Sequence, residues 1–232
     1  NLGTVYAKQK EFAKALHHFE RSRDLLRDLN EQSNLVVALT NIGGAYSELN
    51  DTTRALASLR EALALSERIG DMRSMAVARI NIGELYGKAG DHERAYVTFE
   101  EGLRNTEESQ DPWVRSQLLM NIGVSSFEMG RLKEAAERGE EALALARREG
   151  IITPMRDAAE LLAKVYRKEG RFEQALEAQL LFTQLRDSLM NEENQRAVIG
   201  FDLRRNYERQ ALTDSLQHAS ETAVQVKEIQ KQ

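Results

Sequence analysis

Four asparagines recur at intervals of 40 residues, and their side chains are well suited to hydrogen-bond another molecule. They are Asn1, Asn41, Asn81 and Asn121. Each primary amide offers both a donor and an acceptor. A row of such amides could hydrogen-bond the main chain of an extended peptide without reading its side chains. The alternative is that each asparagine links one element of the scaffold to the next.

Other candidate binding residues lie at fixed distances from these asparagines. The residue directly before the asparagine is Thr40, Ile80 or Met120, and the residue seven places after it is Lys8, Glu48 or Lys88. The residue four places before it, one helical turn away, is Val37, Val77 or Gln117, and Asp157 takes the same place before Leu161. These residues predict a groove that is apolar in its middle, with charges of alternating sign along one edge. Such a surface suits a peptide or helix with hydrophobic anchors. We expect Val37 and Val77 to be half-buried between helices. Because Leu161 replaces the fifth asparagine, the groove should end or turn apolar there.

Catalytic, metal and cofactor sites find no support in the sequence. His17 and His18 are adjacent, so they face different sides of a helix and cannot share a metal. His92-Glu93 lacks a second histidine at the spacing of a zinc protease. The glycines occur singly rather than in a phosphate-binding loop, and cysteine is absent. We therefore expect a chain that is no enzyme and needs no metal or cofactor.

The overall charge argues against nucleic acid as a partner. The net charge is −5, and the acidic and basic residues are interspersed, whereas nucleic-acid binders carry a concentrated basic surface. No apolar run approaches the length of a membrane span. The lack of cysteine leaves the cellular compartment open. Since Asn1 already lies inside a repeated motif, we expect the chain to be a piece of a longer protein.

The asparagines belong to a longer pattern that repeats with the same period. Each is followed by Leu or Ile and then Gly, with Tyr three places later in most copies, and further series contain Ala15, Ala55, Ala95, Ala135 and Ala175, or Phe19, Leu59 and Phe99. The composition favours helix, because straight-chain residues lose little rotamer freedom there. The pattern predicts an all-α chain of two-helix repeats. The small residues let helices approach closely, and stacked hairpins bury a core that one hairpin cannot.

Turn and capping residues mark where these helices begin and end. Gly70 and Gly150 should close two helices, because glycine suits the left-handed position after a helix. Asp111-Pro112 and Thr153-Pro154 each place a capping side chain before a proline at the first helical position.

The combination Leu-Gly-x-x-Tyr, Ala, Phe and Ala resembles the tetratricopeptide repeat, in a subclass with a period of 40 instead of 34. The resemblance covers residues 1–186, with repeats starting near 1, 41, 81, 121 and 161. It implies a right-handed α-solenoid of antiparallel helix hairpins whose concave face carries the asparagines. Repeats that bind chaperone tails pair this asparagine with a basic residue one turn away. Here that turn supplies Val37, Val77, Gln117 and Asp157, so we do not expect a carboxylate clamp.

Residues 187–232 lack the repeat pattern and predict a long C-terminal helix. Leu212, Leu216, Ala219, Ala223 and Val226 follow a heptad spacing, which is typical of a coiled coil. The helix could form a homodimer, or it could pack back on the last repeat. Arg186-Asp187-Ser188-Leu189 and Tyr207-Glu208-Arg209-Gln210 resemble the segment that follows the repeats in bacterial membrane-bound sensors, whose outputs are adenylate/guanylate cyclases, histidine kinases or DNA-binding domains.

Together these features predict a peptide- or protein-binding repeat domain that acts as the input module of a larger signalling protein. The alternative is a constitutive assembly scaffold without a regulatory output. The sensor resemblance favours the periplasmic side of a membrane-anchored parent, and a cytoplasmic position is also open. We expect no direct membrane insertion by this chain.

Overall fold

The computed structural model describes residues 2–191, except for the side chains of residues 108 and 109, and every regular element in this range is a helix. The helices are α1 (Leu2–Lys8), α2 (Phe12–Asp28), α3 (Gln32–Glu48), α4 (Thr52–Ile69), α5 (Met72–Lys88), α6 (His92–Ser109), α7 (Pro112–Glu128), α8 (Leu132–Arg148) and α9 (Ile152–Lys168). A further helix occupies residues 172–191, up to the end of the described range. The predicted all-α solenoid is confirmed.

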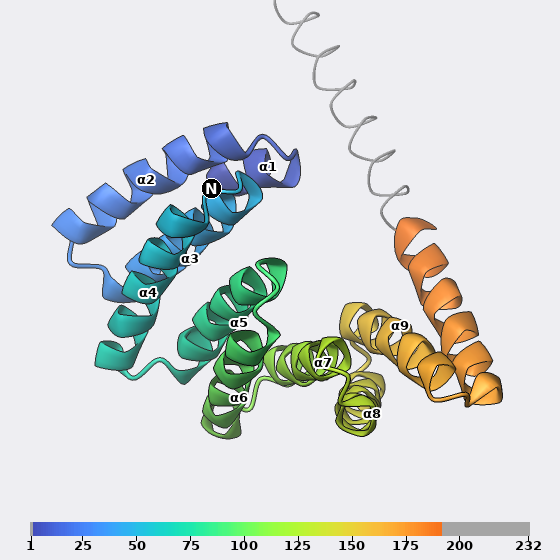
Figure 1. The fold of residues 1–232 in the computed structure, drawn as a ribbon. Helices are drawn as coiled ribbons and strands as arrows, with labels where there is room; N and C mark the ends of the chain where they lie inside the picture. The colour runs from blue at the N-terminus through green and yellow to red at the C-terminus, as the bar shows by residue number, and fades with distance from the viewer. Residues whose placement is uncertain (1, 192–232) are drawn as a thin grey trace, which may run out of the picture. The chain divides into compact units, whose positions relative to one another are not determined.

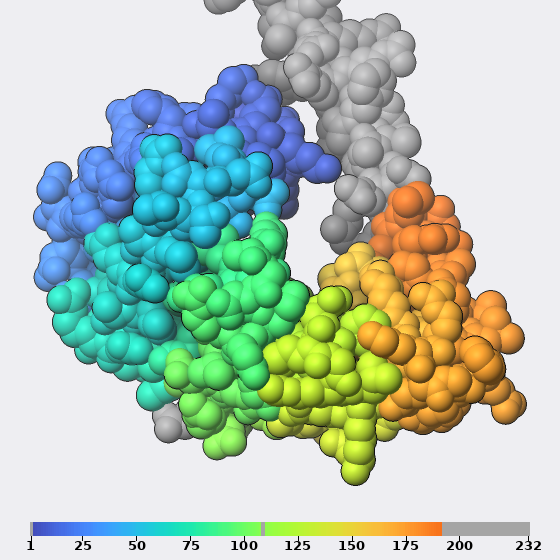
Figure 2. Space-filling view, viewed as in Figure 1, coloured from blue at the N-terminus to red at the C-terminus, as the bar shows by residue number. Residues whose placement is uncertain are grey.

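Successive helices pair as antiparallel hairpins, each made of an odd-numbered A helix and an even-numbered B helix (Figure 1). The A helices also contact one another: α3 touches α5, α5 touches α7 and α7 touches α9. The B helices contact mainly their neighbours in the chain. Because each A helix reaches the next A helix, these helices form the inner layer of the stack. Successive repeats lie directly against one another (Figure 2).

In the first three repeats, the glycine of the A helix lies against the large apolar residue of its own B helix, whereas Gly123 of α7 lies against Leu161 of α9. A Cβ atom built at Gly43 would lie only 2.5 Å from Leu59 Cγ, and one at Gly83 would overlap the Phe99 ring. Leu59 is fully buried and Phe99 is 3% exposed. The absence of a side chain at these glycines therefore lets a neighbouring helix approach closely, as predicted for the small residues of the pattern.

Tyrosines on the A helices connect one repeat to the repeat before it. Tyr46 donates a hydrogen bond to Glu20 Oε1 at 2.9 Å, and Tyr166 donates to Glu140 Oε1 at 2.6 Å. In each case the partner is a B-helix residue 26 positions earlier. Arg171 also lies over the Tyr166 ring, 4.2 Å from its centre. These tyrosines hold repeats together and are not free to bind a ligand.

Aspartates begin several helices, and left-handed residues follow several. Asp111 accepts hydrogen bonds from the backbone N–H of Trp113 and Val114 at 3.0 and 3.1 Å, with proline next in the chain as predicted. The second predicted proline cap is wrong. Helix α9 begins at Ile152, so Thr153 lies inside its first turn. Pro154 is tolerated there because the first N–H groups of a helix have no intrahelical partner.

By their contacts, residues 1–185 and 186–232 form separate units. The predicted C-terminal helix and heptad of residues 187–232 lie almost entirely outside the described residues, and this division stays a prediction. Within residues 2–191, no helix is long and apolar enough to cross a membrane.

Candidate groove along the A helices

Two of the predicted asparagines line a hollow formed by the inner helices α1, α3 and α5. The hollow has a volume of about 400 Å³. Asn41 and Thr40 contribute from α3, and Asn81 contributes from α5. Both asparagines are half-buried, so their amides meet the hollow from the helices that form its wall.

A second hollow, of about 290 Å³, lies between α5 and α7 and contains Asn121. Glu84 and Lys88 line both hollows. The two hollows are therefore adjoining parts of one groove along the A helices. Three of the four predicted asparagines occur in this groove. Asn1 lies outside the described residues.

The hydrogen bonds of the asparagines differ from one another. Asn81 Nδ2 donates to the carbonyl of Val77 in its own helix at 2.8 Å. Asn121 is only 8% exposed, and its Nδ2 has no hydrogen-bond partner. Thr40 donates to the carbonyl of Val36 at 2.9 Å. The Asn81 bond stays within α5, so it gives no support to a scaffold link from one A helix to the next.

The charged edge of the groove contains an ion pair between repeats. Lys88 Nζ lies 3.3 Å from Glu48 Oε1 and 3.2 Å from Ser47 Oγ. Glu48 and Lys88 both line the first hollow. Lys8 is exposed on α1 but does not line either hollow. The alternating charges therefore neutralise each other in part.

Some candidate residues lie elsewhere than the sequence suggests. Ile80 and Met120 are 6% and 9% exposed, belong to the hydrophobic core and do not line the groove. The position before each asparagine turns toward the B helices, so only the polar Thr40 reaches the hollow. Val77 is half-buried as expected, whereas Val37 is 54% exposed, so the expectation of half-burial is wrong for Val37.

The structure also adds groove residues that were not singled out from the sequence. Glu84 lies three places after Asn81, and Gly44 lies three places after Asn41. Gly87 lines the hollow between α5 and α7. A Cβ atom added at Gly44 or Gly87 would meet nothing within 4 Å. Helical spacing from the asparagines could have identified the first two, since residues three apart share a face.

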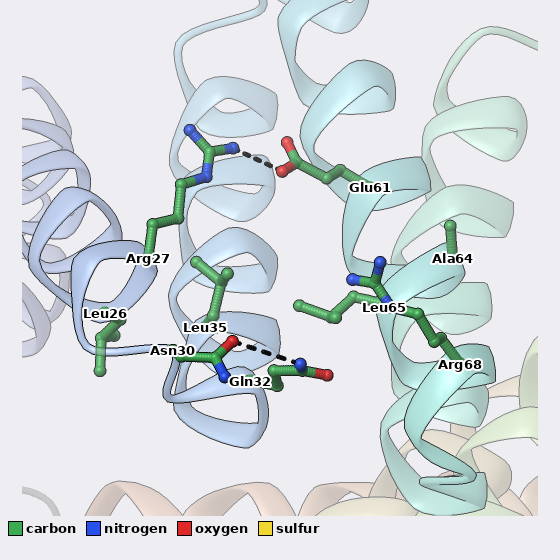
Figure 3. A pocket seen from close by; sticks show the side chains of 9 residues that line it. All are labelled: Leu26, Arg27, Asn30, Gln32, Leu35, Glu61, Ala64, Leu65 and Arg68. Carbon is green, nitrogen blue, oxygen red and sulfur yellow. Dashed lines mark hydrogen bonds and ion pairs between the residues drawn. The ribbon is translucent and has the colours of Figure 1, made fainter.

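A separate hollow of about 550 Å³ lies where α2, α3 and α4 meet, away from the asparagines. Figure 3 shows its polar side chains bonded to each other: Arg27 reaches Glu61 at 2.5 Å, and Gln32 reaches Asn30 at 3.4 Å. Leu26, Leu35 and Leu65 form its apolar part. None of these residues belongs to the repeated asparagine pattern.

Two of the histidines in the described range contact other rings. His18 stacks on Tyr6, with ring centres 5.3 Å apart. Within residues 2–191, no group of three or more His, Asp or Glu side chains could hold a metal ion. The groove offers hydrogen-bonding amides, carboxylates and small residues, which is chemistry for binding another molecule.

The fold and the repeat pattern both match known proteins. Tetratricopeptide-repeat models match residues 1–68, 76–108 and 116–149. No curated protein matches the sequence. Among solved structures, BtubC from P. vanneervenii is similar at a TM-score of 0.69 and 19% identity, over 81% of this chain and 78% of that one.

Two other similar structures are larger than this chain. The Rap protein complexed with competence and sporulation factor has a TM-score of 0.69 and 20% identity, over 79% of this chain and 51% of its own. The Rap conjugation gene regulator of plasmid pLS20, in complex with the Phr* peptide, has a TM-score of 0.70 and 16% identity, over 83% and 53%. The chain thus spans about half of these Rap proteins, and at such identities the likeness shows the fold alone. Because the tetratricopeptide-repeat family models match three segments and the same segments fold as repeated helix hairpins, the chain carries an array of tetratricopeptide repeats.

Proposed function

We propose that the groove along the A helices binds an extended peptide or protein segment, and that the array acts as the input module of a larger signalling protein. The observation that carries the first part is the position of Asn41, Asn81 and Asn121 in two adjoining hollows. Their amides can hydrogen-bond a main chain. Two structures of similar fold hold a signalling factor or peptide, which supports the same use here.

The groove can be tested with nine-residue random peptides displayed on phage, selected on the purified chain and then resynthesised. Gly44→Leu is the sharpest variant, because a Cβ atom at Gly44 would meet nothing within 4 Å and the rest of the new side chain would occupy the groove. We expect this variant to lose binding while remaining folded. Ala57→Leu, on the exposed face of α4, is the matched control and should bind normally.

The asparagines can be tested with the same peptides. Asn41→Ala combined with Asn81→Ala should weaken binding about tenfold, since each net hydrogen bond contributes about 0.5–1.5 kcal/mol. Fluorescence anisotropy measures the change. Unchanged affinity in this double variant and in Gly44→Leu would place binding elsewhere and contradict the proposal.

The input role depends on residues 187–232, which we propose transmit binding by changing their pairing. Sedimentation velocity with and without a selected peptide measures this. We expect the peptide to shift the monomer–dimer balance and deletion of residues 205–232 to abolish the dimer. A dimer that survives the deletion, or one indifferent to peptide, favours the constitutive scaffold instead.

A further inference from the structure

The hollow between α5 and α7 has the size and walls of a pocket for one side chain. Its volume is about 290 Å³, and Gly83, Gly87, Phe99 and Val124 form much of its lining. Gly83 cannot carry a side chain, because a Cβ atom there would overlap the Phe99 ring. Gly87 has open space in front of it. The two glycines leave space for a ligand side chain, and Phe99 and Val124 suit the aliphatic part of such a side chain.

The charges around this pocket are mainly negative. Glu84 and Glu128 line it, and neither makes an ion pair with another residue of the described range. Lys88 also lines it, but its ammonium group is already paired with Glu48. His92 is the remaining titratable group of the lining. Two carboxylates thus stand without a cationic partner.

The surroundings of Glu84 make a cationic partner favourable. Part of the side chain faces solvent, yet crowding by protein atoms raises the pKa of Glu84 above its ordinary value, with the Asn121 amide and Lys88 acting in the opposite direction. A carboxylate that has lost hydration gains more from a nearby cation than one in bulk water does.

Asn121 is a further polar group in the lining of this pocket. Within the described residues, the three buried side-chain polar atoms without a hydrogen-bond partner are on Ser116, Gln117 and Asn121, all in α7. Of these three residues, Asn121 alone lines the pocket. Its amide also lowers the pKa of Glu84, so this buried polar group lies next to the carboxylate that would hold a cation.

We propose that this pocket selects a lysine or arginine of the bound segment. The aliphatic stem lies against Phe99 and Val124, and the cationic head lies between Glu84 and Glu128. The Asn121 amide lies beside Glu84 and lowers the pKa of that carboxyl, which favours the charged form that the cation needs. This inference rests on the proposed peptide-binding function and adds the residue class that the groove reads.

An acidic or a purely apolar side chain fits less well. An acidic group would meet two carboxylates, and the nearest ammonium would have to leave Glu48 to reach it. An apolar side chain would cover Glu84 without giving it a partner, and burying an unpaired charge is unfavourable.

The experiment uses the phage-displayed nine-residue library on the whole chain. We expect the selected peptides to share one basic residue at a fixed position. Replacing it by its uncharged counterpart, norleucine for lysine or citrulline for arginine, should weaken binding to the unaltered chain by at least about tenfold. On the double variant Glu84→Gln/Glu128→Gln, the same replacement should change affinity by less than about twofold.

The matched control is Glu107→Gln/Glu137→Gln, which changes the net charge equally at exposed residues of α6 and α8. It should keep the full preference for the basic peptide. Gly87→Leu should fill the pocket and remove the preference while Gly83 remains in place.

The possible results distinguish a failure of the pocket proposal from a failure of the proposed peptide binding. Peptides that bind through the groove, weaken with Gly44→Leu and show no basic preference would overturn the pocket alone. A basic preference that survives Glu84→Gln/Glu128→Gln would do the same. If no peptide binds, or binding ignores Gly44→Leu, then the proposed function fails and the inference fails with it.

Discussion

Lys88 on α5 and Glu48 on α3 are one repeat apart in sequence, and they meet at the edge of the groove with Nζ 3.3 Å from Oε1. Their side chains are 58% and 49% exposed, and such exposed pairs stabilise a fold little. The pair matters for recognition instead. Lys88 forms its ion pair with Glu48, and neither Glu84 nor Glu128 has an ion pair within the described residues, so the pocket between α5 and α7 presents two carboxylates to a ligand.

Two glycines of α5 should respond in opposite ways to the same substitution. Gly83→Ala should destabilise the chain by about 1–3 kcal/mol, because the new methyl group overlaps Phe99. Gly87→Ala should stabilise it by about 0.5–1 kcal/mol, because alanine favours helix and nothing blocks it. Urea unfolding followed by circular dichroism measures both. Equal effects would show that the Gly83–Phe99 contact is not as close as described.

Loss of the Tyr166 hydroxyl should weaken the connection between repeats. Tyr166→Phe keeps the ring under Arg171 but removes the 2.6 Å bond to Glu140, so we expect a loss of about 0.5–1.5 kcal/mol. Tyr6→Phe is the control, since no hydrogen bond of its hydroxyl joins it to the described residues.

The same bond should make stability depend on alkaline pH. Burial and then Glu140 raise the pKa of Tyr166 above 10. The stabilising contribution is therefore complete below pH 10 and is lost as the pH rises through the higher folded value. The pKa values of Tyr46 and Tyr96 are raised as well, so tyrosine absorbance at alkaline pH should show several late-ionising groups, and Tyr166→Phe should remove one of them.

The cap at Asp111 should be needed for the start of α7. Burial alone would raise the pKa of Asp111, but Arg73 and the N–H groups of Val114 and Trp113 together hold it below 3.8. Its contribution is thus present above about pH 3.8 and lost as the pH falls below that value. Asp111→Ala should destabilise the chain by about 1 kcal/mol at neutral pH, and Asp111→Asn, which can still cap, by less. Similar losses in both variants would mean that the charge matters more than the cap.

Binding of a lysine peptide should strengthen as the pH rises above 4.5. The pKa of Glu84 is raised from that value, so its carboxylate forms only at higher pH. Glu128, Glu48, Lys88 and His92 also face the groove, and Glu84→Gln isolates the contribution of the one group. This variant should show a flatter pH profile by anisotropy; an unchanged profile would assign the dependence to the other groups.

The sequence predicted the helical array well because its signals are local and repeated. A glycine and a large apolar residue 16 positions later recur in three repeats, as Gly3 and Phe19, Gly43 and Leu59, and Gly83 and Phe99, so a single hairpin geometry accounts for all three pairs. The start of α9 was misplaced because Pro154 is compatible with several positions in the first turn. Local spacing alone could not decide between them.

The groove was predicted only in part, because side-chain direction depends on how the helices rotate against each other. Asn41 and Asn81 line it as expected, but Ile80 turned into the core with the neighbouring B helices. Glu84 was missed although it shares a face with Asn81. Glu84 matters because it lines the same hollow as Asn121 on α7, and the sequence does not show that α5 and α7 bring these two residues together.

The constant repeat length has a consequence for how the array opens. Within the described range, side-chain hydrogen bonds between repeats join residues no more than 41 positions apart. Each repeat is thus held by its immediate neighbours, as in a one-dimensional chain of coupled units. Amide protons should exchange faster toward the ends of the array than in α5 and α7. A ligand that spans α3 to α7 would tie three such units together and slow exchange in all of them at once.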